Sequence, residues 1–284
     1  MERRSEDGPE RLRCGVVVST GGAAVFADLA VAAERAGWDA VFSYEVPWGQ
    51  DAWVTLTAAA MRTSTIRLGT MLTPLPRVRP WELAARAATL DDLSGGRVQL
   101  AVGMGALHEG WLAFEADEGR RTRAEKLDEG LAVYDGLMRG QPFSWSGKHY
   151  RVSPTTFLAP PPPVQRPRVP VWVVGAHPST RSLGRAARWD GLLPARVGTA
   201  DPLTPADLPD IVEAVRTVRE SAGLPWAGYD VVVEGTSEPG PAGDAVAARW
   251  RTAGATWWVE SDWAMGEDAV ARHRRRIEAG PPRA

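Results

Sequence analysis

Residues 89–105 read TLDDLSGGRVQLAVGMG, and the pattern in this stretch decides the fold class. A helical spacing of apolar residues ends at Ser-Gly-Gly, and the apolar run over 98–102 then predicts a buried strand. Two glycines, Gly103 and Gly105, follow where the strand stops. Glycine lets backbone approach a flat ligand closely, although a tight turn into the next helix explains the same residues equally well.

The same unit, a short apolar run followed by an amphipathic stretch, recurs along the chain. Strands are predicted at 12–18, 40–44, 67–72, 98–102, 171–174, 191–193, 231–234 and 256–259. Eight strand–helix units favour an α/β fold closed into a TIM (β/α)8 barrel, and a doubly wound open sheet is the alternative. We expect a single domain over 12–284, preceded by a charged, disordered tail over 1–11.

An insertion separates the fourth and fifth predicted strands. Residues 143–152, FSWSGKHYRV, have the pattern of a hairpin with Gly147 in its turn. The following tract, LAPPPPVQRPRVP, cannot continue a helix or lie in a central strand, so we expect it to cross the surface in an extended form.

Composition excludes several classes of function. The formal net charge is −2 and the pI is about 6.1, so no broad basic field suggests nucleic acid as a partner. Cys14 is the only cysteine, which excludes an internal disulfide and a zinc site built on several thiolates. No apolar run approaches the ~18 residues of a membrane span. We expect a cytoplasmic protein with a small-molecule substrate, and a homodimer is left open.

Three blocks carry a family resemblance: RVRPWELAARAATLDDLSGGRVQLAVGMG, PVWVVGAHPSTRSLGRAARWDG and AGATWWVE. Their order resembles the luciferase-like monooxygenase family of flavin-dependent oxidoreductases, from about Cys14 to the C-terminus. Members bind FMN or the deazaflavin coenzyme F420. The resemblance implies a bacterial luciferase-like barrel that holds the flavin ring at its mouth.

The resemblance also implies where the ring lies. It places a bulge at Thr70 and Met71 at the end of the third strand, often with a non-proline cis peptide, and Thr73 near the polar edge of the ring. Gly103 and Gly105 would lie beside the ring. The alternative is an ordinary strand end with Met71 in the core.

A flavin phosphate is expected in the loop GAHPST after the fifth strand, because the first turn of a helix presents free N–H groups and the positive end of its dipole. Ser179 at this position also suits a plain helix cap. The residues concerned are Gly175, Ala176, His177, Ser179 and Thr180.

Two residues, His108 and Glu45, are candidates for proton transfer. His108 follows the fourth strand, and Tyr44 and Glu45 stand where many deazaflavin-dependent relatives have an Asp-His pair. A solvated loop histidine and a Glu45 that is merely hydrogen-bonded at the rim are the alternatives. The sequence HEGWL is not HExxH, so no metal site is expected.

Large aromatic residues near the predicted strand ends suit an apolar substrate, although they also suit a simple roof over the barrel. Carboxylates at the ends of the seventh and eighth strands suit a polar substrate group or a solvated rim. The candidates are Tyr44, Trp48, Trp111, Trp263, Glu234 and Glu260.

The sequence therefore predicts an enzyme that transfers a hydride between F420 or FMN and a small organic substrate. An FMN-dependent monooxygenase that uses reduced flavin and oxygen is the second hypothesis. A non-catalytic barrel that only binds flavin is the third.

Overall fold

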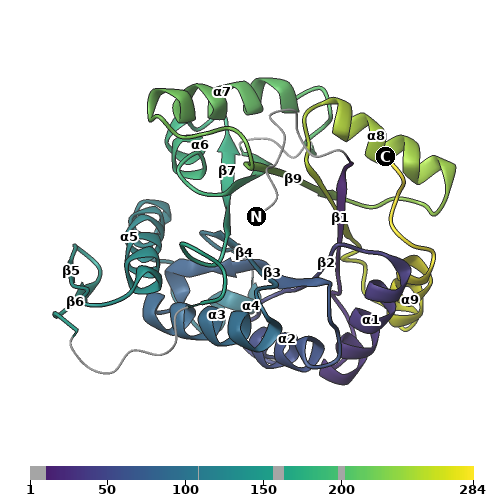
Figure 1. The fold of residues 1–284 in the computed structure, drawn as a ribbon, viewed down its shortest axis with the longest axis horizontal. Helices are drawn as coiled ribbons and strands as arrows, with labels where there is room; N and C mark the ends of the chain where they lie inside the picture. Colours follow the sequence, from purple (N-terminus) through teal and green to yellow (C-terminus); the bar gives the residue numbers. More distant parts are fainter. Residues whose placement is uncertain (1–10, 108, 156–162, 198–201) are drawn as a thin grey trace.

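A computed structural model of the chain describes residues 11–107, 109–155, 163–197 and 202–284, so all of the expected N-terminal tail except Arg11 lies outside the described residues. Eight parallel strands form a closed barrel in the order β1-β10-β9-β8-β7-β4-β3-β2. Figure 1 looks into this barrel and shows helices around its outside. The predicted TIM barrel is confirmed, and the open sheet is wrong. No helix among the described residues combines the length and apolar character needed to cross a bilayer.

The barrel strands are β1 (Arg13–Val17), β2 (Ala40–Ser43), β3 (Arg67–Pro74), β4 (Val98–Gly103), β7 (Val171–His177), β8 (Gly191–Arg196), β9 (Asp230–Gly235) and β10 (Trp257–Ser261). The helices are α1 (Ala23–Ala36), α2 (Ala52–Ala60), the 3-10 helix η1 (Leu75–Arg77), α3 (Pro80–Ser94), α4 (Glu109–Leu112), α5 (Arg120–Arg139), α6 (Thr180–Ala186), α7 (Leu208–Ser221), α8 (Pro241–Thr252) and α9 (Ala269–Glu278).

Local signals explain where several of these elements begin and end. The Asp51 side chain accepts hydrogen bonds from the N–H groups of Trp53 and Val54 and caps α2. Helix α3 ends at Gly95, whose φ of 68° lies in the left-handed region that glycine adopts without a steric penalty. The Ser-Gly-Gly stop predicted from the sequence is therefore confirmed.

The strands at the fifth and sixth barrel positions are longer than predicted. The apolar run ends at Val174, but parallel pairing continues through Ala176 opposite Ala195 to His177 opposite Arg196. Pairing with a neighbouring strand, rather than hydrophobicity, extends β7 and β8. Residues 175–177 consequently lie on a strand and not in the loop that follows it.

The insertion contains the predicted hairpin. Strands β5 (Trp145–Ser146) and β6 (Arg151–Val152) pair antiparallel, and Gly147 N–H donates to the Tyr150 carbonyl at 3.0 Å. The Glu129 carboxylate on α5 accepts N–H bonds from residues 148, 149 and 150, which fixes the hairpin to that helix. Residues 156–162 of the proline tract lie outside the described residues.

Aromatic side chains fill the lower part of the barrel. The rings of Trp172 and Trp257 meet edge to face with centroids 5.1 Å apart, and Phe42 lies 5.7 Å from Trp172. Neighbouring strands make room with glycine: a Cβ on Gly15 would lie 2.7 Å from Phe42, and one on Gly191 would lie 2.5 Å from Trp172. The barrel interior is therefore a packed core.

An ion pair closes the N-terminal end of the barrel. Arg13 and Asp230, the first residues of β1 and β9, pair with each other. Asp230 also accepts a bond from Trp172 Nε1 at 3.0 Å, and the Arg13 guanidinium lies 4.6 Å from the Trp257 ring centre. The strands therefore offer space for a ligand at their C-terminal ends.

Candidate active site

A cavity of about 750 Å³ opens at the C-terminal end of the barrel, which is a volume suited to a small-molecule ligand. We call it the mouth cavity. Its walls include eight of the residues predicted from the sequence: Tyr44, Glu45, Met71, Gly103, Gly105, Trp111, Ala176 and Trp263. The structure thus brings together residues from most of the predicted strand ends.

The predicted bulge forms one wall of the mouth cavity. Thr70 pairs with Leu100 and Thr73 with Val102, so β3 has one more residue than β4 between these pairs, and the Met71–Leu72 peptide bond is cis. The predictions of a bulge and a non-proline cis peptide are confirmed. Met71 is 4% exposed and packs in the barrel interior while also lining the cavity. The two alternatives for Met71, a core residue and a residue beside the cavity, therefore describe the same position.

Glu45 is held by a chain of hydrogen bonds behind this wall. Thr73 Oγ1 donates to Glu45 Oε1 at 2.7 Å, and Trp53 Nε1 donates to the same oxygen at 2.8 Å. The Thr70 hydroxyl lies 2.8 Å from that of Thr73. Burial raises the pKa of Glu45, and the two donors oppose that shift in part. Glu45 consequently holds a proton to higher pH than an exposed glutamate does.

A second, polar cavity of about 260 Å³ adjoins the first. Glu45 and Trp111 line both cavities, while Gln50, Asp51 and Arg86 line only the polar one. Glu45 therefore lies in the wall between a largely apolar chamber and a polar one. This is a suitable place for a group that exchanges a proton with solvent and delivers it inside.

The loop after β4 is fixed by two arginines. Arg77 Nη2 donates to the Ala106 carbonyl at 2.9 Å, its guanidinium lies 4.4 Å from the Trp111 ring centre, and Arg123 Nη1 donates to the Gly105 carbonyl at 3.1 Å. Gly105 has a φ of 79°, and a Cβ there would clash with Arg77 and lie 2.8 Å from Pro74. Its glycine serves the turn, which corrects the expectation that it makes room for a ring.

Gly103 differs from Gly105. A Cβ on Gly103 would lie 3.0 Å from Val174 and 3.2 Å from Leu72, and both of those side chains line the mouth cavity. The absence of a side chain on Gly103 lets Val174 and Leu72 approach the end of β4 at the cavity wall. Gly103 therefore remains a candidate contact for a flat ligand.

The residues of the expected phosphate loop face two directions, because successive side chains of β7 point to opposite faces of the barrel wall. Ala176 lines the mouth cavity, whereas a Cβ on Gly175 would clash with Leu192 and lie 3.1 Å from Leu183 of α6. Glycine at 175 is thus required for packing against the helix, and His177, two residues on, is on the same outer face. Ser179 accepts a bond from Ser182 N–H at 3.3 Å and caps α6, which begins at Thr180. The backbone groups of 175–180 and the exposed Thr180 side chain remain candidate phosphate ligands.

Other predicted residues lie away from the cavity. Trp48 is 80% exposed and is a solvated rim residue, which corrects its assignment to the substrate pocket. Glu260 is also corrected. It is 3% exposed on the outer face of β10, where it pairs with Arg276 at 3.0 Å and accepts bonds from Ser237. Thr70 and Thr73 are fully buried and act on Glu45 rather than on a ligand.

Glu234 follows the inward-facing Val232 by two residues on β9, so it faces the barrel mouth beyond the walls of the mouth cavity. It is accessible to solvent, and desolvation by the surrounding protein raises its pKa. His108 lies outside the described residues. In the part of the chain that is described, no three His, Cys, Asp or Glu side chains are grouped to hold a metal ion.

Several wall residues were not predicted from the sequence. The cavity also includes Leu72, Met104, Arg120, Arg123, Val174, Ala195 and Val197. The alternation of β7 and β8 is the signal that identifies Val174 and Ala195, once the strands are known to run past their apolar runs. The role of Trp53 as a donor to Glu45 has no signal in the local sequence.

A closed parallel barrel with a ligand-sized cavity at its C-terminal end, beside a bulged third strand, defines a (β/α)8 barrel with its functional site at the mouth. The chain belongs to the luciferase-like monooxygenase family, whose model matches residues 10–280.

Individual relatives extend this finding. An F420-dependent glucose-6-phosphate dehydrogenase of Nakamurella multipartita is 32% identical over 226 residues, which cover 75% of this chain and 63% of that protein. Monooxygenase RslO1 from Streptomyces bottropensis superposes with a TM-score of 0.76 at 21% identity, over 94% of this chain and 98% of that one. The F420-dependent tetrahydromethanopterin reductase of Methanopyrus kandleri gives a TM-score of 0.73 at 18% identity, over 95% and 97%. These structures show a shared fold.

Proposed function

We propose that this protein is an oxidoreductase that binds F420 or FMN at the barrel mouth and transfers a hydride between the cofactor and a small organic substrate. The observation that carries the proposal is the mouth cavity itself, with the bulge of β3 on one side and the half-buried, protonatable Glu45 beside it. Family membership and the F420-dependent relative support the same class of reaction.

The cavity walls fit a flat ring. Met71, Leu72, Val174 and Ala195 are apolar, and Gly103 adds no side chain to this wall. The backbone of 175–180 lies at the neighbouring end of β7 and offers N–H groups of the first helical turn to a phosphate. A bound flavin or deazaflavin supplies the hydride chemistry, and the protein supplies position and field.

The residues of the chain divide the remaining tasks. Glu45, with Thr73 and Trp53 fixing one carboxyl oxygen, holds a proton at its other oxygen and exchanges it through the polar cavity. Trp111 and the pair of Tyr44 and Trp263, whose rings meet edge to face at 5.7 Å, offer an apolar surface to the substrate. An apolar alcohol or carbonyl compound fits this surface better than a charged sugar.

The apolar walls also favour a second candidate, an FMN-dependent monooxygenase, because exclusion of water protects oxygenated flavin chemistry. The fold shared with RslO1 is compatible with this alternative. F420 remains our first choice because a relative that is 32% identical over 75% of this chain is F420-dependent.

Titration of the purified chain with F420 and with FMN, followed by fluorescence quenching, tests the proposal. Tight binding of F420 is the expected result. Binding of FMN alone, with oxygen uptake when the flavin is reduced, would favour the monooxygenase. Failure to bind either ring at micromolar concentration would leave a non-catalytic barrel and overturn the proposal.

A further inference from the structure

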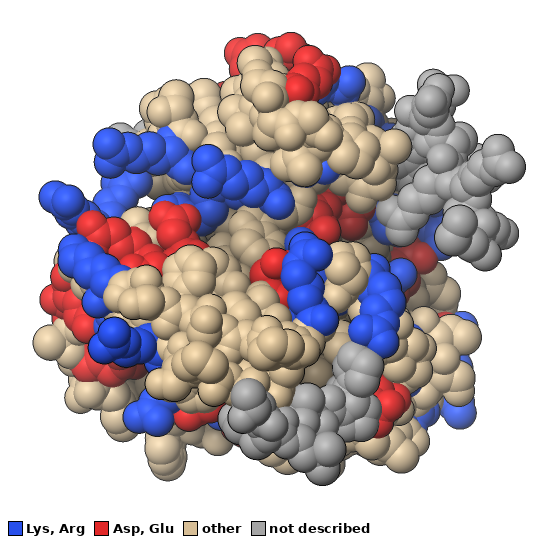
Figure 2. Space-filling model, turned by 60° about the vertical axis from the view of Figure 1, so that its left-hand side comes forward, with Lys and Arg blue, Asp and Glu red and all other residues tan. Residues whose placement is uncertain are grey.

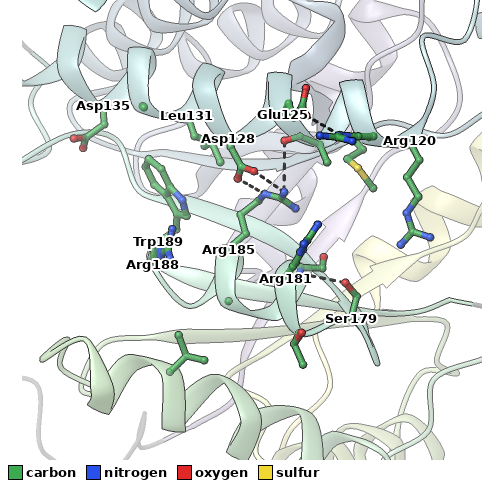
Figure 3. A pocket seen from close by; sticks show the side chains of 18 of the residues that line it. Arg120, Glu125, Asp128, Leu131, Asp135, Ser179, Arg181, Arg185, Arg188 and Trp189 are labelled. Carbon is green, nitrogen blue, oxygen red and sulfur yellow. Dashed lines mark hydrogen bonds and ion pairs between the residues drawn. The ribbon is translucent and has the colours of Figure 1, made fainter. Parts of the chain in front are cut away.

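Helices α5 and α6 follow the adjacent strands β4 and β7, but a groove of about 1230 Å³ separates them. Figure 3 shows Arg120 extending from α5 toward α6, and Arg181 extending from α6 in the opposite direction. Figure 2 brings the α5 side forward and shows Lys and Arg side chains gathered on this face with acidic residues between them. Seven arginines and three carboxylates line the groove: Arg120, Arg121, Arg139, Arg168, Arg181, Arg185, Arg188, Glu125, Asp128 and Asp135.

The carboxylates are already paired. Asp128 binds Arg185 through both oxygens at 2.5 and 2.8 Å. Asp135 pairs with Arg139 at 2.7 Å and with Arg168 at 2.9 Å, and Glu125 pairs with Arg121 at 3.0 Å.

Three groove arginines remain. Within the described residues, no hydrogen bond or ion pair reaches the side chains of Arg120, Arg181 or Arg188, all of which are exposed. The chain as a whole is slightly acidic, so this local excess of positive charge is a feature of the groove.

The groove is continuous with the mouth cavity. Met104 and Arg120 line both spaces, and Ser179 and Thr180 of the expected phosphate loop line the groove. A ligand chain that leaves the mouth cavity past Met104 therefore enters the groove directly.

The face of α6 and the turn after it is suited to an extended anionic chain. Residues 181, 184, 185 and 188 all line the groove, and this spacing places them on one side of a helical turn. Arg181 and Arg188 are about 10 Å apart along the axis. Between them a Cβ on Gly184 would meet no atom within 4 Å, so the floor is open.

We propose that this groove binds the anionic side chain of the deazaflavin cofactor, with Arg181 and Arg188 pairing with its carboxylates and Arg120 guiding it out of the mouth. The proposal rests on the proposed function. FMN ends in one phosphate, whereas F420 continues beyond its phosphodiester into glutamates. Guanidinium groups bind such carboxylates in a bidentate manner. The groove would thus select F420 over FMN.

The test titrates the full chain with FMN and with F420 carrying short and long glutamate tails, at low and high salt. The double variant Arg181→Gln/Arg188→Gln is compared with Arg249→Gln, which removes an exposed arginine of α8 outside the groove. We expect the double variant to weaken long-tailed F420 roughly tenfold or more and to reduce its salt dependence. The double variant should bind FMN as the wild type does, and the Arg249→Gln variant should bind both cofactors with unchanged affinity.

A second pair of variants does not rely on removing arginine. Gly184→Glu adds a negative charge to the open floor, and Gly184→Ala adds only a methyl group. The glutamate should weaken long-tailed F420 alone, and the alanine should have no effect. If F420 binds but its affinity changes neither with tail length nor in these variants, the inference is wrong and the proposed function stands. Equal weakening of FMN would assign the arginines to the phosphate and also overturn the inference, and a chain that binds neither ring overturns both.

Discussion

The two ends of the barrel use inward-facing residues in opposite ways. At the N-terminal end these residues are large or charged: Arg13 pairs with Asp230, and Asp230 accepts a hydrogen bond from Trp172. At the C-terminal end the inward residues of three adjacent strands are small, namely Gly103, Ala176 and Ala195. The comparison shows that the same alternation builds a packed floor or an open chamber according to side-chain volume alone.

The electrostatics differ in the same way. The Asp230 carboxylate at the floor faces a guanidinium. At the mouth, the donors to Glu45 among the described residues, Thr73 and Trp53, are neutral, and burial raises the pKa of Glu45. Charge is neutralised at one end and kept available for proton transfer at the other.

The largest effect is expected from breaking the floor. Trp172→Ala removes the central side chain of the barrel interior and the donor to Asp230, and should cost about 3–5 kcal/mol of unfolding free energy. Urea unfolding measures this loss. Trp263→Ala at the rim, where the side chain is 47% exposed, is the matched control and should change stability by less than about 1 kcal/mol. Similar losses at both sites would remove the distinction between floor and mouth.

The next effect concerns the proton held at the mouth. Glu45→Gln should lower turnover about 100-fold or more if Glu45 is the general acid. In the wild type, turnover should fall as pH rises through the raised pKa of Glu45, and this limb of the pH profile should vanish in Glu45→Gln. Thr73→Val removes a donor that lowers the pKa of Glu45, so the falling limb of this variant's pH profile should shift to higher pH.

Stability provides a readout of Glu45 that needs no substrate. The folded state keeps the Glu45 proton where the unfolded chain has lost it, so this residue makes stability fall as pH rises from the ordinary glutamate value to the raised one. Glu45→Gln should flatten that slope in unfolding experiments at several pH values. An identical slope in both proteins would mean that Glu45 titrates normally.

The smallest effect is expected at the boundary between floor and mouth. Met71 packs on the interior core and lines the cavity, so Met71→Ala should weaken cofactor binding by about 2 kcal/mol, near the lower end for a buried methionine. Isothermal titration measures the change, and contacts of the phosphate should be unaffected. A loss below about half a kcal/mol would show that Met71 belongs to the floor only.

Much of the architecture could be predicted from the sequence because its causes are local. Apolar runs with helical stretches and glycine stops identified all eight barrel strands, and the stretch 89–105 contains one complete example. The family motif at 67–74 also predicted the bulge and the cis peptide. Glu45 was identified by its position after β2, although not by its partners.

Only the tertiary structure decided which face each residue occupies. Glu234 and Glu260 both end apolar runs, yet Glu234 faces the mouth and Glu260 pairs with Arg276 on the outer face. Side chains alternate between the two faces of a strand, and pairing with the neighbouring strands sets which face each residue occupies. The same register turned Gly175 outward and Ala176 inward. The basic groove likewise depends on two helices that are distant in sequence, so no local pattern contains it. Within the described part of the chain, its unpaired arginine side chains are those that do not bind the carboxylates of α5.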